Sequence, residues 1–528
     1  MEDETYDGYT IDNVVVSGLN GRATVVLSTP LSNTLFYKSV TPSPITVDVA
    51  NNKTISGGEA QLRFNIMPTV ITSDLPIVVT ATLTSSDGTK VMLTQSITVE
   101  SDVEFARSSY NTINCRAMTT TGTEYWSDLG SSSFSSFGGG SGTSSSPYLI
   151  STAQHMADLA AGLGGKYLND HFQLQNDIDL SGRKWSLSDS APTFYGTFDG
   201  NGYKISGLYV DESTGYKGLF YCLSGATIKN LGVSGSVSSS SGGNVGGIAG
   251  YADFSSTITD CYFVGSVSGS SSYVGGVVGL VNSSTVTNCY NTASVSGGGG
   301  FVGGVVGCAT SSPITNCYNT GAVSSSDSST SKVGGVVGNA SDNSHITNCY
   351  NTGEVSGLYR SIGGVAGSTS GLTLINCYNL GGVSGNSTGQ YIGGVVGYVN
   401  TSYIVNSYNQ GVVGDGSYVG GVTGLLNSSN LINVYNTGEV SGSSPVGGVI
   451  GSCYNSSIAN SYYLKDSYSV GVGEIISLDG TATEMEKDEM QSDDFAATLN
   501  ENATSLLDTY TTICGWTTTT DNYPSLQY

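Results

Sequence analysis

Hydrophobic residues in the central part of the chain occur in short β-prone runs separated by glycine, serine and asparagine, with no helix-length amphipathic stretch among them. One phrase, Val or Ile followed by Gly-Gly, an aliphatic residue, a small or aliphatic residue and Gly, recurs eight times at steps of 27 to 31 residues. A second phrase, aliphatic-x-Asn-Cys-Tyr-Asn, follows most copies with small variations, and Gly-x-Val-Ser-Gly closes most units. A period of this length is typical of a solenoid. The first glycines of the eight copies are Gly246, Gly275, Gly303, Gly334, Gly363, Gly393, Gly420 and Gly447.

Each unit predicts one coil of a parallel β-helix. Three strands of about five residues and three turns fill about 28 residues as a triangular coil, with crossovers that we expect to be right-handed. Coils stack about 4.8 Å apart, so equivalent residues lie above one another. Two aliphatic columns are therefore expected in the core. They are Ile258, Val286, Ile314, Ile346, Leu374, Ile404, Leu431 and Ile458, and Ile248, Val277, Val305, Val336, Val365, Val395, Val422 and Val449.

The asparagine of the second phrase forms a polar column. Its side-chain amides are expected to bond to one another between coils at a bend, where they satisfy turn backbone groups. The paired glycines are expected to let the chain turn tightly or adopt a positive φ at a corner. The polar column is Asp260, Asn288, Asn316, Asn348, Asn376, Asn406, Asn433 and Asn460.

Five of the ten cysteines occupy one column, directly after the asparagine. The next coils place Ser407, Val434 and Ser461 in the same column, which indicates that the site requires a small buried residue. Stacked free thiols are therefore favoured, and disulfides between coils are the alternative. No Cys-x-x-Cys pair exists, which argues against zinc. The cysteines of the column are Cys261, Cys289, Cys317, Cys349 and Cys377.

These units resemble GLUG-motif repeats of bacterial surface proteins. The resemblance covers roughly residues 140–528. Residues 142–237, with GTSSSPYLISTAQHMADLA and FYGTFDGNGYKISGLYV, resemble the lead-in of such arrays. The chain from Glu489, with EMQSDDFAATLN and GWTTTTDNYPSLQY, resembles their tail. The resemblance implies a cell-surface repeat protein.

A β-helix leaves unpaired strand edges at both ends, so caps are expected. Residues 151–163 start at a Ser/Thr cap and predict a short capping helix, with Met156, Leu159 and Leu163 on its apolar face. Residues 484–508 predict a C-terminal helix, followed by a strand over residues 523–528. The apolar stripe of this second helix is Met485, Met490, Phe495 and Leu499.

Residues 1–118 differ in kind, because their hydrophobic residues alternate along longer runs. This alternation predicts an antiparallel β-sandwich. The stretch from LRFNIMPTV to VMLTQSITV resembles a fimbrillin-like domain of Bacteroidetes-type surface proteins. The expected organisation is a sandwich over 1–118, a Ser/Gly-rich linker over 119–147, a β-helix over 148–475 and a C-terminal cap over 476–528. The predicted strands are 13–16, 23–27, 45–49, 60–66, 77–83 and 91–99.

The composition points outside the cell. Only 11% of residues are charged, 74 are glycine, and the net charge is −24. An acidic chain without a basic stripe is a poor partner for nucleic acid or anionic membranes. The sequence contains no stretch of 18 apolar residues, so it predicts no membrane-spanning helix. We expect an outer-membrane lipoprotein, with a leader and lipid-anchor cysteine ahead of the acidic start Glu2-Asp3-Glu4, so that membrane contact is through that anchor alone.

Some parallel β-helices cleave polysaccharides, so the acidic residues of the chain are candidate catalytic groups. Acid–base work on sugars needs paired carboxylates, and adjacent repeats share no column of two acids. The three histidines have no metal-ligand spacing. We expect no enzyme, no metal and no cofactor. The acids of the lead-in favour Asx turns, with a calcium site or a catalytic site as alternatives. They are Asp177, Asp179, Asp189, Asp199 and Asp211.

Two sets of aromatic residues are the candidate binding residues. One is the column after the cysteine, which is either an exposed aromatic stripe or a stack under a loop. The other lies in the segments ahead of the glycine pairs, expected to be variable loops that carry recognition. The predicted binding residues are Tyr290, Tyr318, Tyr350 and Tyr378 in the column, and Tyr273, Phe301, Tyr391 and Tyr418 in the loops.

The sequence favours a non-catalytic adhesin or ligand-binding protein that presents a rigid rod to a host or dietary glycan or to a surface protein. Two alternatives stay open. One is a polysaccharide-acting β-helix enzyme, and the other is a structural or fimbria-associated subunit whose sandwich docks or exchanges a strand.

Overall fold

The computed structural model gives the backbone of eleven strands ahead of residue 125 and a fuller description of most of the chain after it. The fully described ranges are 125–130, 137–163, 168–187, 193–213, 215–270, 273–327, 331–386, 390–507, 509–510, 512–518 and 522–527.

The first part of the chain forms antiparallel sheets, as the alternation predicts. The described strands give a five-stranded sheet of order β11-β8-β7-β1-β4, a four-stranded sheet of order β10-β5-β2-β3, and the pair β6-β9. All six predicted strand runs overlap a strand, and each pairing is antiparallel. Side chains here lie outside the described residues, and so does the fimbrillin-like resemblance. The strands are β1 Thr10–Ser17, β2 Arg22–Ser28, β3 Asn33–Lys38, β4 Ile45–Thr54, β5 Gln61–Ile66, β6 Val70–Ile71, β7 Ile77–Thr84, β8 Lys90–Ile97, β9 Val103–Glu104, β10 Asn111–Asn114 and β11 Thr119–Thr120.

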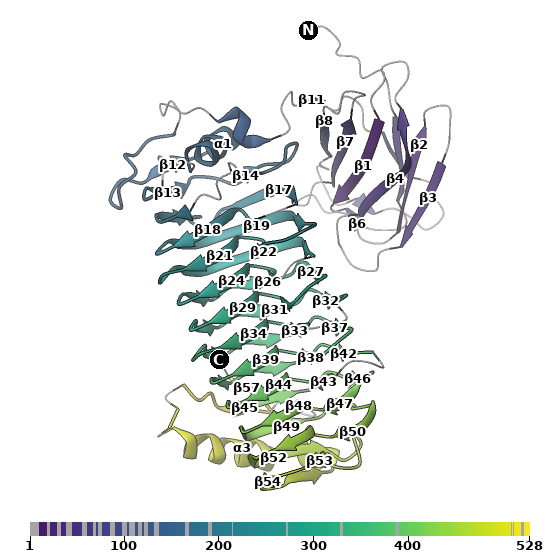
Figure 1. The fold of residues 1–528 in the computed structure, drawn as a ribbon, viewed down its shortest axis with the longest axis vertical. Helices are drawn as coiled ribbons and strands as arrows, with labels where there is room; N and C mark the ends of the chain where they lie inside the picture. The colour runs from purple at the N-terminus through teal and green to yellow at the C-terminus, as the bar shows by residue number, and fades with distance from the viewer. Residues whose placement is uncertain are drawn as a thin grey trace.

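The rest of the chain winds into the predicted parallel β-helix, visible as a ladder of coils in Figure 1. Its described strands form three long parallel sheets of 25, 11 and 8 strands. The 11-stranded sheet takes one strand from each coil, for example Val278 beside Val306 of the next coil. Its strands are β15 Thr193–Phe194, β18 Phe220–Ser224, β21 Ala249–Asp253, β24 Val278–Asn282, β29 Val306–Thr310, β34 Val337–Ser341, β39 Ala366–Ser370, β44 Val396–Asn400, β48 Thr423–Asn427, β51 Ile450–Tyr454 and β53 Val472–Ile475.

The other two sheets complete each coil. The 8-stranded sheet lies just before the 11-stranded one along each repeat, and the 25-stranded sheet follows it with up to three short strands per coil. The 8-stranded sheet consists of β20 Asn244–Gly246, β23 Tyr273–Gly275, β28 Phe301–Gly303, β33 Lys332–Gly334, β38 Ser361–Gly363, β43 Gln390–Gly393, β47 Ser417–Gly420 and β50 Ser443–Gly447. The 25-stranded sheet consists of β12 Tyr148–Ile150, β13 His171–Leu174, β14 Ile178–Asp179, β16 Thr197–Asp199, β17 Lys204–Glu212, β19 Thr227–Ser239, β22 Thr257–Gly269, β25 Thr285–Thr287, β26 Tyr290–Asn291, β27 Ser294–Gly297, β30 Ile314–Thr315, β31 Tyr318–Asn319, β32 Val323–Ser325, β35 Ile346–Thr347, β36 Tyr350–Asn351, β37 Val355–Gly357, β40 Thr373–Ile375, β41 Tyr378–Asn379, β42 Val383–Ser384, β45 Tyr403–Asn409, β46 Val413–Gly414, β49 Asn430–Asn436, β52 Ser456–Leu464, β54 Leu478–Asp479 and β55 Ala482–Met485.

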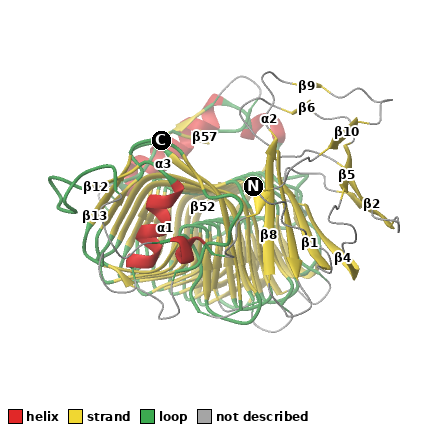
Figure 2. Ribbon diagram, turned by 90° about the horizontal axis from the view of Figure 1, so that it is seen from above, coloured by secondary structure: helices red, strands yellow, loops and turns green. Residues whose placement is uncertain are grey.

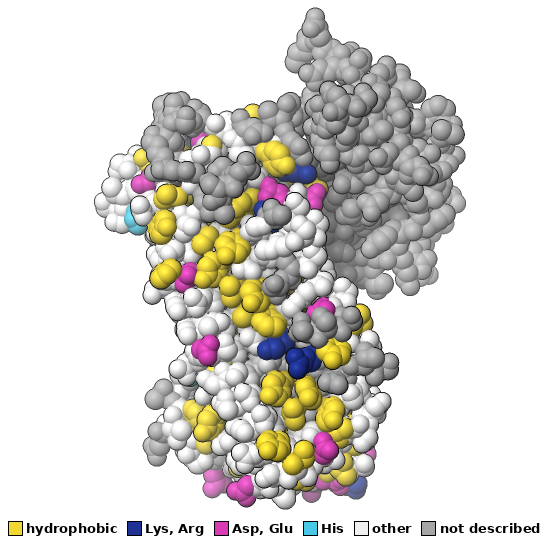
Figure 3. Space-filling view, viewed as in Figure 1, with side chains coloured by type: hydrophobic (Ala, Val, Ile, Leu, Met, Phe, Trp, Pro, Cys, Tyr) yellow, Lys and Arg dark blue, Asp and Glu magenta, His cyan; other side chains and the backbone are white. Residues whose placement is uncertain are grey.

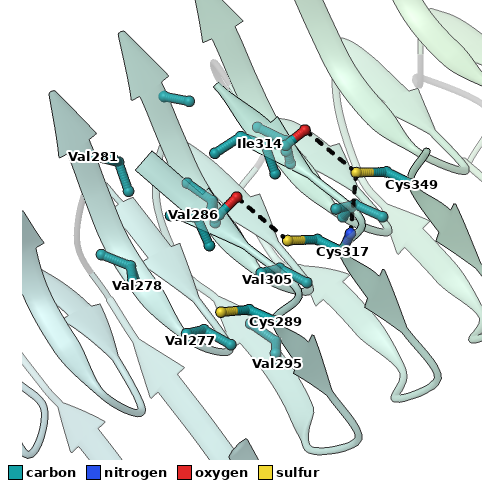
Figure 4. Close-up of a cluster of buried hydrophobic side chains, with 14 of the residues drawn as sticks. Val277, Val278, Val281, Val286, Cys289, Val295, Val305, Ile314, Cys317 and Cys349 are labelled. Atoms are coloured by element: carbon teal, nitrogen blue, oxygen red, sulfur yellow. Dashed lines mark hydrogen bonds between the residues drawn. The ribbon is translucent and has the colours of Figure 1, made fainter. Parts of the chain in front are cut away.

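The interior of the rod contains the predicted core columns. Both aliphatic columns are fully buried, apart from a slight exposure of Ile458. The cysteine column is also buried, and all nine cysteines within the described ranges are free thiols, which confirms the prediction for the column. Figure 4 shows Cys317 donating to the carbonyl oxygen of Val286 at 3.6 Å, among valines of neighbouring coils. The tenth cysteine, Cys115, lies outside the described residues.

The glycine pairs allow a close approach of backbones at a corner, and of the two expected alternatives the positive φ is wrong. None of the eight pairs has a positive φ. A Cβ on Gly275 would lie 2.0 Å from the carbonyl oxygen of Val278, and one on Gly276 would lie 2.1 Å from that of Gly304. Backbones of one coil and of the next meet at this corner, and no side chain fits between them.

The predicted asparagine ladder is confirmed. Each amide donates to the side-chain oxygen of the preceding coil at 2.8 to 3.0 Å, from Asn288 onto Asp260 through Asn433 onto Asn406. The backbone bends here, with φ between 50 and 55° throughout this column. This left-handed conformation is one that asparagine adopts more readily than most residues.

A second asparagine ladder, not predicted, lies inside the rod. The last asparagine of the Asn-Cys-Tyr-Asn phrase is fully buried, and each amide donates to the next coil's side chain at 2.8 Å. Its second N–H bonds to a backbone oxygen two residues on, as from Asn319 to Gly321. The signal in the sequence was the recurrence of this asparagine in six of the eight phrases, with Phe263 in the first and Tyr463 in the last. The ladder is Asn291, Asn319, Asn351, Asn379, Asn409 and Asn436.

The N-terminal end of the rod carries the expected cap. Helix α1, Ala153–Gly162, begins at Thr152, whose side chain accepts from the backbone N–H of His155. Figure 2 shows α1 lying across the end of the coils. Met156, Leu159 and Leu163 are buried in the core, as predicted. The short helix η1, Trp126–Leu129, is joined to α1 by Gln154 Nε2, which donates to the carbonyl oxygen of Leu129 at 2.7 Å.

The C-terminal segment contains helices, as expected, but Met485 lies in strand β55 and not on a helix, and the segment lies along the side of the rod. It contains α2 Lys487–Met490, α3 Asp493–Leu506, β56 Trp516–Thr517 and β57 Ser525–Leu526. Phe495 of α3 contacts Tyr462 edge-on at 5.1 Å between ring centroids. Asn433 of the outer ladder donates to the carbonyl oxygen of Leu499 at 3.1 Å. An apolar stripe in the sequence predicts burial, but it does not say against which surface.

Candidate functional site

The predicted tyrosine column is a continuous stack of rings. Register places one tyrosine above the next in each coil. Neighbouring centroids from Tyr262 to Tyr435 lie 4.8 to 5.0 Å apart, with ring planes within 10° of parallel. Because the faces cover one another, the stack presents ring edges and hydroxyls to its surroundings.

Only part of this stack is open. Tyr408 and Tyr435 are buried under the C-terminal segment, where Trp516 lies 5.7 and 5.6 Å from their rings. Tyr378 packs against the same cluster and marks its boundary. The open ladder, by which we mean Tyr262, Tyr290, Tyr318 and Tyr350, stays partly exposed. The column is therefore a partly exposed aromatic stripe in one part of the rod and a stack covered by another segment in the other part.

Burial keeps these phenols neutral. It raises the pKa of Tyr290, Tyr318 and Tyr350, and it raises the pKa of Tyr378 to about 12. For Tyr435, which is completely buried, the pKa is raised well above its usual value. At neutral pH the open ladder is an uncharged row of hydroxyl groups, suited to hydrogen bonding rather than to charge recognition.

The second set of predicted residues lies in strands, so the expectation of variable loops is wrong. Tyr273, Phe301, Tyr391 and Tyr418 sit at or near the starts of β23, β28, β43 and β47, in one column of the 8-stranded sheet. Strand pairing from coil to coil extends to these positions. A single sequence does not show whether such a position lies in a paired strand or in a loop. Ring pairs here are tilted, at 36° for Tyr273 with Phe301 and 60° for Tyr391 with Tyr418.

Two cations complete this surface. Lys332 follows Phe301 in the same column, and Arg360 directly precedes Ser361, which pairs with Lys332. The Lys332 ammonium lies 4.8 Å from the centroid of Phe301 and donates to Asn339 Oδ1 at 2.8 Å. We call this surface the corner stripe: Tyr273, Phe301, Lys332, Arg360, Tyr391, Tyr398 and Tyr418.

The charges of the corner stripe stand alone. Lys332 and Arg360 are the only basic residues between Lys229 and Lys465 in the sequence. Within the described ranges, neither forms an ion pair with a carboxylate. Burial, together with the charge of Arg360, lowers the pKa of Lys332. Figure 3 shows a small basic patch within a band of hydrophobic side chains along this face. The sequence analysis assigned neither residue a role, although their isolation on adjacent repeats is visible in the sequence.

The acids of the lead-in serve the fold. Asp179 accepts from the N–H of Ser181 at 2.9 Å, and Asp199 accepts from that of Asn201 at 2.8 Å. These are the expected Asx turns. Asp199 also pairs with Lys229 at 3.3 Å. Burial tends to raise the pKa of Asp199, but bonds from Asn230, Asn201 and Lys229 outweigh it and leave the pKa lowered.

The other described acids of the lead-in form ion pairs with lysines. Asp177 pairs with Lys204 at 3.9 Å, and Asp211 pairs with Lys184 at 3.7 Å. In the part of the chain that the structure describes, no three His, Cys, Asp or Glu side chains are placed to hold a metal ion. The same part contains no helix long and apolar enough to cross a membrane. Asp189 lies outside the described residues.

Comparison with known proteins supports the repeat assignment. The GLUG motif matches residues 241–268 and 329–356, both within the rod. A protein of Evansella cellulosilytica described as a Gly-rich membrane protein is 39% identical over 116 residues, which cover 20% of this chain and 13% of that protein. Among solved structures, an IgA1 protease aligns with 76% of this chain and 30% of its own, at 14% identity and a TM-score of 0.31. The chain thus spans a small part of either protein, and a TM-score this low carries no functional argument.

Proposed function

We propose that this β-helix of GLUG repeats is a non-catalytic binding protein of the bacterial cell surface, an adhesin that presents a rigid rod to a glycan or to a surface protein. The observation that carries the proposal is the corner stripe. It combines partly exposed, tilted aromatic rings with two cations that have no carboxylate partner in the described ranges, on a chain with little other charge.

The two aromatic surfaces suit different contacts. Rings that are tilted against each other leave part of each face available, and an aromatic face is the platform on which a sugar ring stacks. The stacked rings of the open ladder leave only edges and hydroxyls exposed. Sugar stacking is therefore better suited to Tyr391 and Tyr418 of the corner stripe than to the tyrosine column.

For the open ladder, the ligand that we propose is a surface protein. The chain's own C-terminal segment already covers the continuation of this column, with Trp516 and Phe495 against Tyr435. A polypeptide that carries aromatic residues therefore fits this type of face.

We also propose that the protein is located at the cell surface and that its N-terminal domain is a fimbrillin-like sandwich. The similarity to the Gly-rich membrane protein of Evansella cellulosilytica supports a surface location. A lipid anchor ahead of Glu2 and a fimbrillin-like sandwich would tether the rod outside the outer membrane. Protease treatment of intact cells that express the protein tests this: digestion of the rod without cell lysis supports it, and protection of the rod contradicts it.

The binding proposal is tested with the purified chain on a panel of immobilised host and dietary glycans, with retention and new reducing ends scored together. Retention without cleavage is expected. Tyr391→Ala with Tyr418→Ala should reduce retention on those glycans, and Tyr454→Ala, an exposed tyrosine elsewhere on the rod, is the matched control. Release of reducing ends by the wild-type chain would overturn the non-catalytic proposal.

A further inference from the structure

We propose that the corner stripe recognises an acidic polysaccharide, a sugar polymer with carboxylate or sulfate groups, laid along the axis of the rod. This inference rests on the proposed binding function and specifies the ligand class. Its observation is the placement of Lys332 and Arg360 on adjacent coils between two groups of aromatic rings.

The cations are available to a ligand. The structure gives the Lys332 ammonium a single hydrogen-bond acceptor, Asn339, and an ammonium has three donors. Arg360 is exposed and makes no ion pair with a described carboxylate. Other lysines of the rod have a carboxylate partner: Lys229 pairs with Asp199 at 3.3 Å, and Lys204 pairs with Asp177 at 3.9 Å. A half-buried ammonium without a carboxylate partner in the described ranges is complementary to an anion supplied from outside.

Aromatic rings flank the cations along the rod axis in both directions. Tyr273 and Phe301 lie on the two coils before Lys332, and Tyr391 and Tyr418 lie on the coils after Arg360. Tyr398 of the neighbouring sheet stands 5.6 Å from Tyr391 and widens this group. The column repeats once per coil, about every 4.8 Å, a spacing close to the rise of one sugar along an extended chain.

This arrangement favours a polysaccharide over an acidic protein. The stripe follows one column over six coils, roughly 24 Å long, with Arg360 and Tyr398 directly beside that column. A protein interface instead has an apolar core surrounded by a polar rim. Stacking on the rings and ion pairing to the two cations then act on the same linear polymer.

The test measures the affinity of the full chain for polygalacturonate, dextran sulfate, uncharged dextran and poly-glutamate, at two salt concentrations. The variant is Lys332→Gln with Arg360→Gln. Its control is Lys229→Gln with Lys465→Gln, which removes the same charge from elsewhere on the chain. Thermal unfolding of each variant shows that it folds.

Preferred binding of a charged polysaccharide, weakened about tenfold or about 1.4 kcal/mol in the Lys332/Arg360 variant but not in the control, is expected. The two charged polymers separate carboxylate from sulfate recognition. Equal weakening in the control, or equal binding of poly-glutamate, overturns the proposal. Retention of dextran with no preference for charge overturns this inference while the proposed function stands. Retention of none of the polysaccharides overturns this inference and the glycan-binding part of the proposed function.

Discussion

The buried asparagine ladder makes the sharpest stability prediction. Asn319 is completely buried and takes part in three side-chain hydrogen bonds: it donates to Gly321 O at 2.7 Å and to Asn351 Oδ1 at 2.8 Å, and it accepts from Asn291 Nδ2 at 2.8 Å. No water reaches this position to replace them. Replacing Asn319 with alanine removes all three bonds.

A buried hydrogen bond contributes about 1 kcal/mol, and a partner left unsatisfied costs more. Asn319→Ala should therefore lower the free energy of unfolding by about 3 kcal/mol. The neighbouring bonds, from Gly353 N–H to Asn351 and from Asn291 to Ala293, remain and limit the loss.

The matched control is Asn316→Gly in the outer ladder. Asn316 is exposed, with one ladder bond on each side at 3.0 Å, and water can replace both. Glycine also tolerates its φ of 53°, so backbone strain does not enter. The expected cost is under about 1 kcal/mol.

Urea unfolding followed by far-ultraviolet circular dichroism measures both variants. Amide hydrogen exchange of the coils around Asn319 shows whether the loss is local, because coils of a solenoid interact mainly with their neighbours. The reasoning is refuted if Asn319→Ala costs no more than Asn316→Gly.

Three further predictions follow from the packing. Gly275→Ala, whose Cβ would meet Val278 O at 2.0 Å, should prevent soluble folding or cost several kcal/mol, whereas Gly382→Ala, with open space around it, should change the unfolding midpoint little; equal effects would contradict the close-approach argument. The pKa of Tyr378 near 12 exceeds that of an unfolded tyrosine, so its stabilising contribution is complete below pH 10 and is lost as pH rises from about 10 through 12; absorbance titration at 295 nm checks this, and ionisation of all tyrosines near pH 10 in the folded chain would count against it. Cys317 is buried, so maleimide should label it only after unfolding, and peptide mass spectrometry that finds it labelled in the native protein would disprove that burial.

The coil and its core followed from the sequence because every repeat carries the same local chemistry. A column of Val, Ile or Leu at one position predicts burial, and stacking then sets the register for all coils at once. The outer asparagine ladder followed by the same logic. The inner ladder was equally periodic, but nothing in the sequence distinguishes an inward-facing asparagine from an outward-facing one.

The sequence by itself determined the parallel β-helix, its two aliphatic columns, the thiol column and the residues of both aromatic sets. Only the tertiary structure decided how those aromatic residues are used. Whether Tyr290 is open or Tyr435 is covered depends on where the C-terminal segment lies, and that segment shares no period with the coils. The meeting of Lys332 with Phe301 likewise depends on one coil stacking on another, a contact between residues far apart in the chain that repeat spacing predicts only after the register is known.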